Sequence, residues 1–115
     1  MKTIYICGPL AGNIRANVNR VMRAVARLTQ EYRNNGTRGI PLFIVPHLIL
    51  NGMTFNTGGE IDRKWGMECC LHLVGLSDEL VVLGDRMTPG MADEVRRAHQ
   101  KAGRWLISTS LSGQD

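Results

Sequence analysis

The residues best suited to chemistry occur in the stretch TPGMADEVRRA, which runs from Thr88 to Ala98. Thr88 can cap a helix with its hydroxyl, and Pro89 suits the first helical position, where no N–H is needed. The stretch therefore predicts a helix from Gly90 to Ala102 with a well-defined start. Apolar side chains at helical spacing form its expected buried face: Met91, Val95, Ala98 and Ala102.

Glu94 lies near the start of this predicted helix, within about 70° of the centre of its apolar face, whereas Asp93 lies on the opposite side. The positive end of a helix favours the ionised form of a carboxylate. A nucleophilic carboxylate needs this kind of placement. A glutamate that merely stabilises the start of a helix fits the same position.

A second candidate lies near the beginning of the chain, in IYICGPLAGN, from Ile4 to Asn13. The apolar run ends at Cys7, and a glycine loop from Gly8 to Gly12 follows it. Glycine lets the backbone approach a ligand closely, and free N–H groups at the start of a following helix can bind phosphate. The loop matches neither GxGxxG nor a P-loop, and Pro9 donates no N–H. A plain turn therefore fits the stretch equally well.

Other side chains have a structural interpretation beside a functional one. Tyr5 can pack in the core or direct its hydroxyl at a carboxylate beyond the strand. His47 can be a site residue or a loop histidine with one hydrogen bond. We expect Asp78 to cap the turn into the third strand. The cysteines are expected to behave as small buried apolar residues: Cys7, Cys69 and Cys70.

Alternating strands and helices must position these residues. We predict strands at Thr3–Cys7, Leu42–Val45, Glu79–Leu83 and Arg104–Ser108, helices at about Arg15–Arg33, Asp62–Leu76 and Gly90–Ala102, a loop at Asn51–Gly59 and a tail from Gly113. This alternation implies an α/β fold, a parallel sheet with helices on both faces. Ligands of such sheets bind beyond the carboxyl ends of the strands, where Cys7–Asn13, Pro46–His47 and Gly84–Gly90 would meet.

The first two predicted helices differ in their apolar pattern. The first carries one apolar stripe, formed by Val18, Val21, Met22, Val25 and Leu28. The second is apolar all round, with one stripe of Trp65, Cys69, Leu73 and Leu76 and another of Met67, Cys70, Leu71 and Val74. Such a helix must be buried on two sides, so we expect one side to be a subunit interface of a homo-oligomer.

Composition narrows the class of protein. The 115 residues make one domain, and 43% apolar residues suffice for a core. The longest apolar run falls short of the ~20 residues of a membrane span, and the first residues do not resemble a signal peptide, so we expect a cytoplasmic protein without a membrane partner. Cysteine and histidine spacing does not support a metal site, and no cofactor is expected.

The charge of the chain bears on its partners. A net charge of +4 with only 5% aromatic residues argues against nucleic-acid binding, which favours clustered basic patches with interleaved aromatics. The basic residues are expected on solvated helix faces. Alternatively, they provide a modest positive field that attracts small anions such as nucleotides.

Together, KTIYICGPLAGN, PHL, SDELVVLGD and TPGMADEVRRA resemble the nucleoside 2-deoxyribosyltransferase-like family, in particular a branch common in phages and bacteria. The resemblance extends from Lys2 to about Ile107. It implies a flavodoxin-like, Rossmann-like three-layer sandwich with a small parallel sheet of about four or five strands. It also implies cleavage or exchange of the N-glycosidic bond of a deoxynucleoside or nucleoside 5'-monophosphate, with sites completed across a dimer contact.

The resemblance assigns roles to individual residues. Glu94 matches the nucleophile, and Tyr5 matches the tyrosine that hydrogen-bonds it. The loop Gly8–Gly12 matches the segment that holds the sugar or its phosphate, and Thr88–Gly90 matches the segment that lines the sugar. The expected substrate-binding residues are Gly8, Pro9, Leu10, Ala11, Gly12, His47, Cys70, Gly84, Thr88, Pro89, Gly90 and Met91.

Two acidic positions of the family pattern carry other residues, Cys70 and Thr88. A thiol with an ordinary pKa of about 8.5 is a poor acid for protonating a departing base. His47 and Asp62 are guesses for that acid. The sequence therefore supports an N-glycosidase or deoxyribosyltransferase, or a nucleotide-binding module without turnover that sequesters a signalling nucleotide. A structural or interaction protein is the third class.

Overall fold

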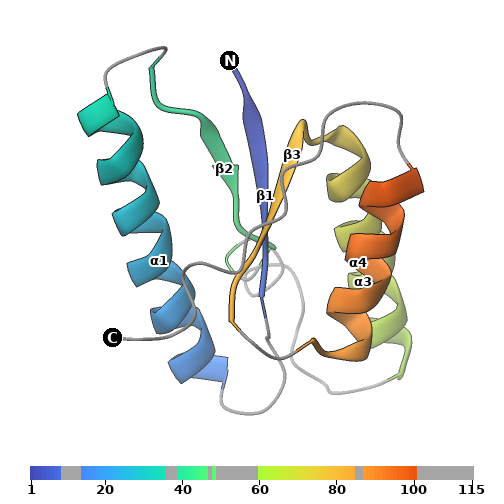
Figure 1. Ribbon diagram of the computed structural model, residues 1–115. Helices are drawn as coiled ribbons and strands as arrows, with labels where there is room; N and C mark the ends of the chain where they lie inside the picture. Colours follow the sequence, from blue (N-terminus) through green and yellow to red (C-terminus); the bar gives the residue numbers. More distant parts are fainter. Residues whose placement is uncertain (9–13, 36–38, 47, 49–59, 85–86, 101–115) are drawn as a thin grey trace.

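The computed structural model describes residues 1–8, 14–35, 39–46, 48, 60–84 and 87–100 (Figure 1). Strands and helices alternate along the chain, as expected for an α/β protein. The bounds of these elements are β1 (Thr3–Cys7), α1 (Ile14–Asn35), β2 (Leu42–Ile44), α3 (Glu60–Leu76), β3 (Glu79–Val82) and α4 (Pro89–Gln100).

The described strands form an open parallel sheet of three strands in the order β2-β1-β3. The first strand is therefore the central one, with Tyr5 opposite Ile44 on one side and Leu80 on the other. At the amino end, the Thr3 N–H donates to Asp78 Oδ2 at 2.8 Å, and the Asp78 N–H donates to the Thr3 carbonyl at 2.8 Å. Asp78 thus joins β1 to β3, which corrects its expected role as a cap of the turn.

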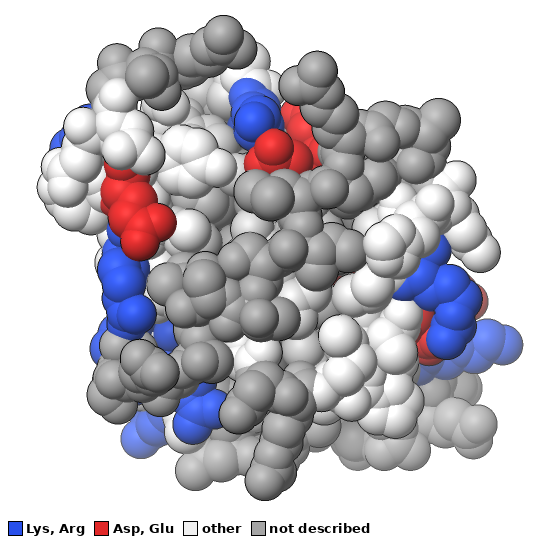
Figure 2. All heavy atoms as spheres, in the orientation of Figure 1, with Lys and Arg blue, Asp and Glu red and all other residues white. Residues whose placement is uncertain are grey.

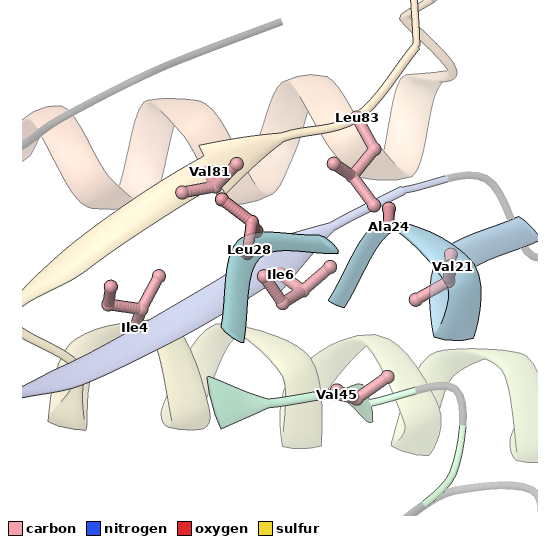
Figure 3. Close-up of a cluster of buried hydrophobic side chains, with 8 residues drawn as sticks. All are labelled: Ile4, Ile6, Val21, Ala24, Leu28, Val45, Val81 and Leu83. Carbon is pink, nitrogen blue, oxygen red and sulfur yellow. The ribbon is translucent and has the colours of Figure 1, made fainter. Parts of the chain in front are cut away.

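Helices cover both faces of the sheet, with α1 on one side and α3 and α4 on the other (Figure 1). Alternate residues of β1 therefore enter different cores. Ile4 and Ile6 pack with α1 in one cluster (Figure 3), whereas Tyr5 and Cys7 pack with α3 and α4 in the other. Because all four side chains are fully buried, the apolar ones each stabilise the fold by about 1.5–3 kcal/mol.

The buried face of α1 is centred differently from the expected one. Val21, Ala24 and Leu28 are buried at i, i+3 and i+7, whereas the Met22 side chain is 39% exposed. Met22 lies about 100° around the helix from Val21, on the side away from Ala24. The expected stripe is therefore correct for Val21 and Leu28 and wrong for Met22.

Helix α3 packs on the core through residues of both apolar stripes, because Cys69 and Leu73 lie partly buried against the same cluster as Cys70 and Val74. Cys70 and Val74 are buried against β1, β3 and α4, whereas Trp65 is 39% exposed and Leu76 is 62% exposed. The expected burial on two sides is therefore not met within a single chain. The subunit interface stays a prediction.

The expected α/β class and parallel sheet are confirmed, and β1 begins and ends as predicted. The second and third strands each end one residue earlier than predicted, at Ile44 and Val82. The strand predicted at 104–108, the loop at 51–59 and the tail lie outside the described residues. Within the described part of the chain, each helix is too short or too polar to cross a bilayer.

Candidate functional site

The candidate site lies at the carboxyl ends of β1 and β3. The chain passes from β1 to β2 on one side of the sheet and then to β3 on the other, so the order reverses between β1 and β3. Open parallel sheets bind ligands at such a reversal, beyond the carboxyl ends of the strands. Gly8 follows β1 here, and Gly84 lies two residues beyond β3 with a φ of 92°. Glycine adopts this left-handed conformation without the strain of a Cβ atom, so the chain can turn at Gly84.

The start of α4 supplies the other side of the site. The Met91 N–H donates to the Thr88 hydroxyl at 3.2 Å, and the Ala92 N–H donates to the Thr88 carbonyl at 2.9 Å. Thr88 is therefore the predicted cap, and the helix begins at Pro89, one residue before the predicted start at Gly90. A Cβ atom on Gly90 would come within 2.9 Å of the Met67 methyl group, so this glycine permits close packing of α4 on α3.

Tyr5 from β1 and Glu94 from the first half of α4 meet in the layer between the sheet and the helices. The Tyr5 side chain is fully buried, and Glu94 is only 7% exposed. Neither the Tyr5 hydroxyl nor Glu94 Oε2 has a hydrogen-bonding partner of ordinary geometry among the described residues. Buried polar atoms are nearly always partnered. These two atoms therefore lack the partner that buried polar atoms ordinarily have.

The electrostatics of Glu94 follow from its burial. Loss of solvation raises the pKa of its carboxyl from 4.5 to about 7, and the nearby charge of Asp93 also raises this pKa. Hydrogen-bonding groups of Tyr5 and Cys7 act in the opposite direction and lower the pKa. Tyr5 and Glu94 are thus close enough to affect each other's ionisation, although they are not aligned as an ordinary hydrogen bond.

The remaining groups beside Glu94 stay neutral at physiological pH. Burial raises the pKa of the Tyr5 phenol, and the charge of Glu94 raises it further. Burial likewise raises the pKa of the Cys70 thiol to about 11 and that of the Cys7 thiol well above its ordinary value. Among the described residues, the site therefore contains one carboxyl beside a phenol and two thiols, all three of them weak proton donors.

Cys7 is the site residue that the sequence did not identify. Its thiol lies 3.9 Å from the Met91 carbonyl, which can accept its hydrogen, and it also approaches Glu94. Cys7 was expected only to pack as a small apolar residue, and it is indeed buried. A signal was present, because Cys7 lies two residues after Tyr5 and so faces the same side of β1.

The structure brings together part of the predicted site. Tyr5, Cys70 and Glu94 lie side by side, Gly8 and Gly84 lie at the strand ends, and Thr88–Gly90 forms the helix start. Met91 is 1% exposed and packs in the core. The other predicted residues lie outside the described part of the chain: Pro9, Leu10, Ala11, Gly12 and His47. The Asp62 side chain is also outside it.

The charged side chains of the described residues do not gather in one place on the face drawn in Figure 2. In the face drawn in Figure 2, the described basic residues lie on separate parts of the rim and not in one patch. The ion pairs between described side chains join Lys2 to Glu79 at 2.9 Å and Arg96 to Asp93 at 2.7 Å. Glu94 belongs to neither. Within the described residues, His, Cys, Asp and Glu side chains do not form a group of three able to hold a metal ion.

Comparison with known proteins adds a family but not an activity. A family model described as a domain of unknown function, DUF7768, matches residues 2–105. This match covers every element of the described fold. No curated protein matches the chain.

Proposed function

The chain belongs to the DUF7768 family, a domain of unknown function, and from the chemistry of its site we propose that it cleaves the N-glycosidic bond of a nucleoside or nucleotide. Glu94 is the proposed nucleophile. One observation carries the proposal: a buried carboxylate at the carboxyl end of the sheet, beside a buried tyrosine, with an oxygen of each unpartnered. The resemblance to nucleoside 2-deoxyribosyltransferases in the same residues supports it.

The proposed reaction has two steps. Ionised Glu94 attacks C1' of the sugar through a transition state with oxocarbenium character, and the base departs. Water or a second base then attacks C1', so that the glycosyl ester is hydrolysed or its sugar is transferred. Tyr5 positions the carboxylate and, as a neutral phenol, helps to keep it ionised.

We also propose the flavodoxin-like sheet, the nucleoside or nucleotide substrate and the homodimer that the resemblance implies. The strand predicted at 104–108 would extend the described sheet into the flavodoxin-like order. The substrate is a small nucleoside or nucleotide, some of it held by the loop 8–12, and each site is completed in a homodimer. The proposed location is the cytoplasm.

Release of free base tests the proposed function. The protein is incubated with neutral deoxynucleosides, their 5'-monophosphates and a pyridinium nucleoside, and free base is measured by chromatography. We expect release from at least one substrate, and Glu94→Gln should lower the rate by at least about 10³-fold because it removes the nucleophile. Asp93→Asn is the matched control, because Asp93 is the adjacent carboxylate and is paired with Arg96 outside the site. Release that is equal in wild type and Glu94→Gln, or absent with every substrate, overturns the proposal.

A nucleotide-binding module without turnover is the second candidate. It is favoured by Cys70, whose buried thiol has a pKa of about 11 and is a weak acid for a departing base. This candidate predicts that an intact nucleotide is recovered from the purified protein and that Glu94→Gln still binds it. Cleavage of every bound nucleotide during incubation excludes it.

A further inference from the structure

The buried carboxylate of Glu94 lacks a cationic partner in the described structure. The pKa of Glu94 is set by burial and by three neighbouring residues. Of these, Tyr5 and Cys7 are neutral and Asp93 is negative. Two basic side chains form ion pairs with carboxylates other than Glu94: Lys2 pairs with Glu79, and Arg96 pairs with Asp93. A buried anion without a cation is costly, so a ligand that brings a positive charge is favoured here.

The same surroundings are poorly suited to donating a proton. Within the described part of the chain, the hydrogen-bonding side chains beside Glu94 are the phenol of Tyr5 and the thiols of Cys7 and Cys70, all of them buried. An effective general acid has a pKa near the working pH, and the Cys70 thiol, at about 11, is far above it. A neutral purine or pyrimidine leaves as an anion unless it is protonated. A cationic base leaves as a neutral molecule.

Resting on the function proposed above, we infer that the substrate is a cationic N-glycoside, of which a pyridinium nucleoside or nucleotide is the type. Its positive ring nitrogen complements the unpartnered buried carboxylate, and its base needs no proton from the site. The same two observations, an unpaired anion and weak donors, therefore point to one substrate class.

The reaction balances without an acid. An electron pair of Glu94 forms the ester bond to C1', and the C1'–N bond breaks with its electron pair going to the ring nitrogen. The nitrogen loses its positive charge and the base departs neutral. Water then adds to C1', the Glu94 carboxylate leaves with the ester electron pair, and the proton of the water passes to solvent.

A leaving-group series on the wild-type protein tests the inference. The kcat/KM for base release is compared between pyridinium nucleosides and neutral purine and pyrimidine deoxynucleosides. We expect the pyridinium substrates to be cleaved at least about 10²-fold faster, the lower end of what a general acid contributes. Equal or faster cleavage of the neutral nucleosides overturns the inference and leaves the proposed function intact. Absence of release from both classes overturns the proposed function itself.

Cys70→Asp provides an independent test by placing an acid beside Glu94. It should raise the ratio of kcat/KM for neutral deoxynucleosides to kcat/KM for pyridinium substrates by at least about tenfold, whatever it does to the pyridinium rate itself. Cys69→Asp is the matched control, because Cys69 is the neighbouring cysteine and is only half buried, and it should not raise this ratio. A similar rise for both substrate classes contradicts the inference. If Cys70→Asp does not fold, the wild-type series decides alone.

Discussion

Glu94 is about half protonated at neutral pH, because burial raises its pKa to about 7. The unpartnered oxygens of Glu94 and Tyr5 lie in the interior of the protein, where bulk water does not reach to hydrogen-bond them. Such a residue destabilises the folded protein whenever it is ionised. Functional sites commonly keep groups of this kind despite their effect on stability.

Replacing Glu94 by glutamine should change how stability depends on pH. The folded pKa of about 7 exceeds the unfolded value of 4.5, so the folded state binds more protons between these values. The wild-type free energy of unfolding therefore falls as pH rises through this window, and the ionisation of Glu94 costs about 3 kcal/mol above it. Glu94→Gln removes this contribution, so its stability relative to wild type should increase by about that amount between pH ~4 and ~8.

Urea unfolding followed by tryptophan fluorescence measures this difference at each pH. Asp93→Asn serves as the control, because it removes an adjacent, half-exposed carboxylate and leaves Glu94 in place. A difference between wild type and Glu94→Gln that is constant with pH contradicts the raised pKa of Glu94.

Removing the Tyr5 hydroxyl should raise the pKa of Glu94 further. Tyr5 lowers this pKa in the folded protein, so Tyr5→Phe should move it above 7 and shift any acidic limb of the activity profile to higher pH. NMR titration of the Glu94 carboxyl carbon measures the shift without a substrate. An unchanged pKa contradicts the placement of Tyr5 beside Glu94.

At the scale of the element, the start of α4 depends on a single side-chain hydrogen bond. The Thr88 hydroxyl accepts from the Met91 N–H, which otherwise has no partner within the helix. Its neighbour Gly90 permits contact with Met67 of α3. The position of Glu94, one turn further on, therefore follows from the cap and from this contact.

Thr88→Ala should lower the free energy of unfolding by about 1 kcal/mol, because it removes the cap. Thr88→Ser keeps the hydroxyl and should restore most of this loss. Thermal unfolding of the three proteins at one pH compares them. If serine is no better than alanine, the threonine acts through its methyl group and not as a cap.

Helix α3 illustrates what its own sequence leaves undetermined. Its two apolar stripes are equally apolar, and nothing in their spacing decides which one packs against the sheet. The structure buries the stripe with Cys70 and Val74, because these residues meet Leu80 and Val82 of β3. Of the other stripe, Cys69 and Leu73 lie partly buried against the same core, whereas Trp65 and Leu76 remain exposed, at 39% and 62%.

At the scale of the molecule, the exposed side chains of Trp65 and Leu76 support the prediction of a homo-oligomer. Exposed large apolar groups on one helix face are typical of association surfaces. Leu76→Lys should therefore shift the protein toward monomer in sedimentation-velocity experiments, whereas Met22→Lys, at an exposed methionine of α1, should not. A wild-type protein that is monomeric at every concentration contradicts the prediction.

The fold was more predictable from the sequence than the details of the site. The apolar run at Ile4–Cys7 predicts a strand buried on both faces correctly, because such a strand has no polar side. The pairing of Tyr5 with Glu94 was anticipated from the resemblance and from the rule on strand ends. Cys7 was missed because a buried cysteine in a strand is expected to pack as a small apolar residue. The exposure of Met22 was missed because periodicity alone did not locate the centre of the buried face.

The central position of β1 has a consequence for synthesis of the chain. During synthesis β1 leaves the ribosome before β3, its partner in the sheet, and the Thr3–Asp78 hydrogen bond beside their pairing joins residues 75 apart in the chain. Contacts this distant in sequence slow folding, because a long loop must close before they form. Until β3 emerges, Ile4–Cys7 is an apolar strand with one edge unpaired. The nascent protein therefore depends on early packing of α1, or on a chaperone, to cover the strand that becomes the centre of its sheet.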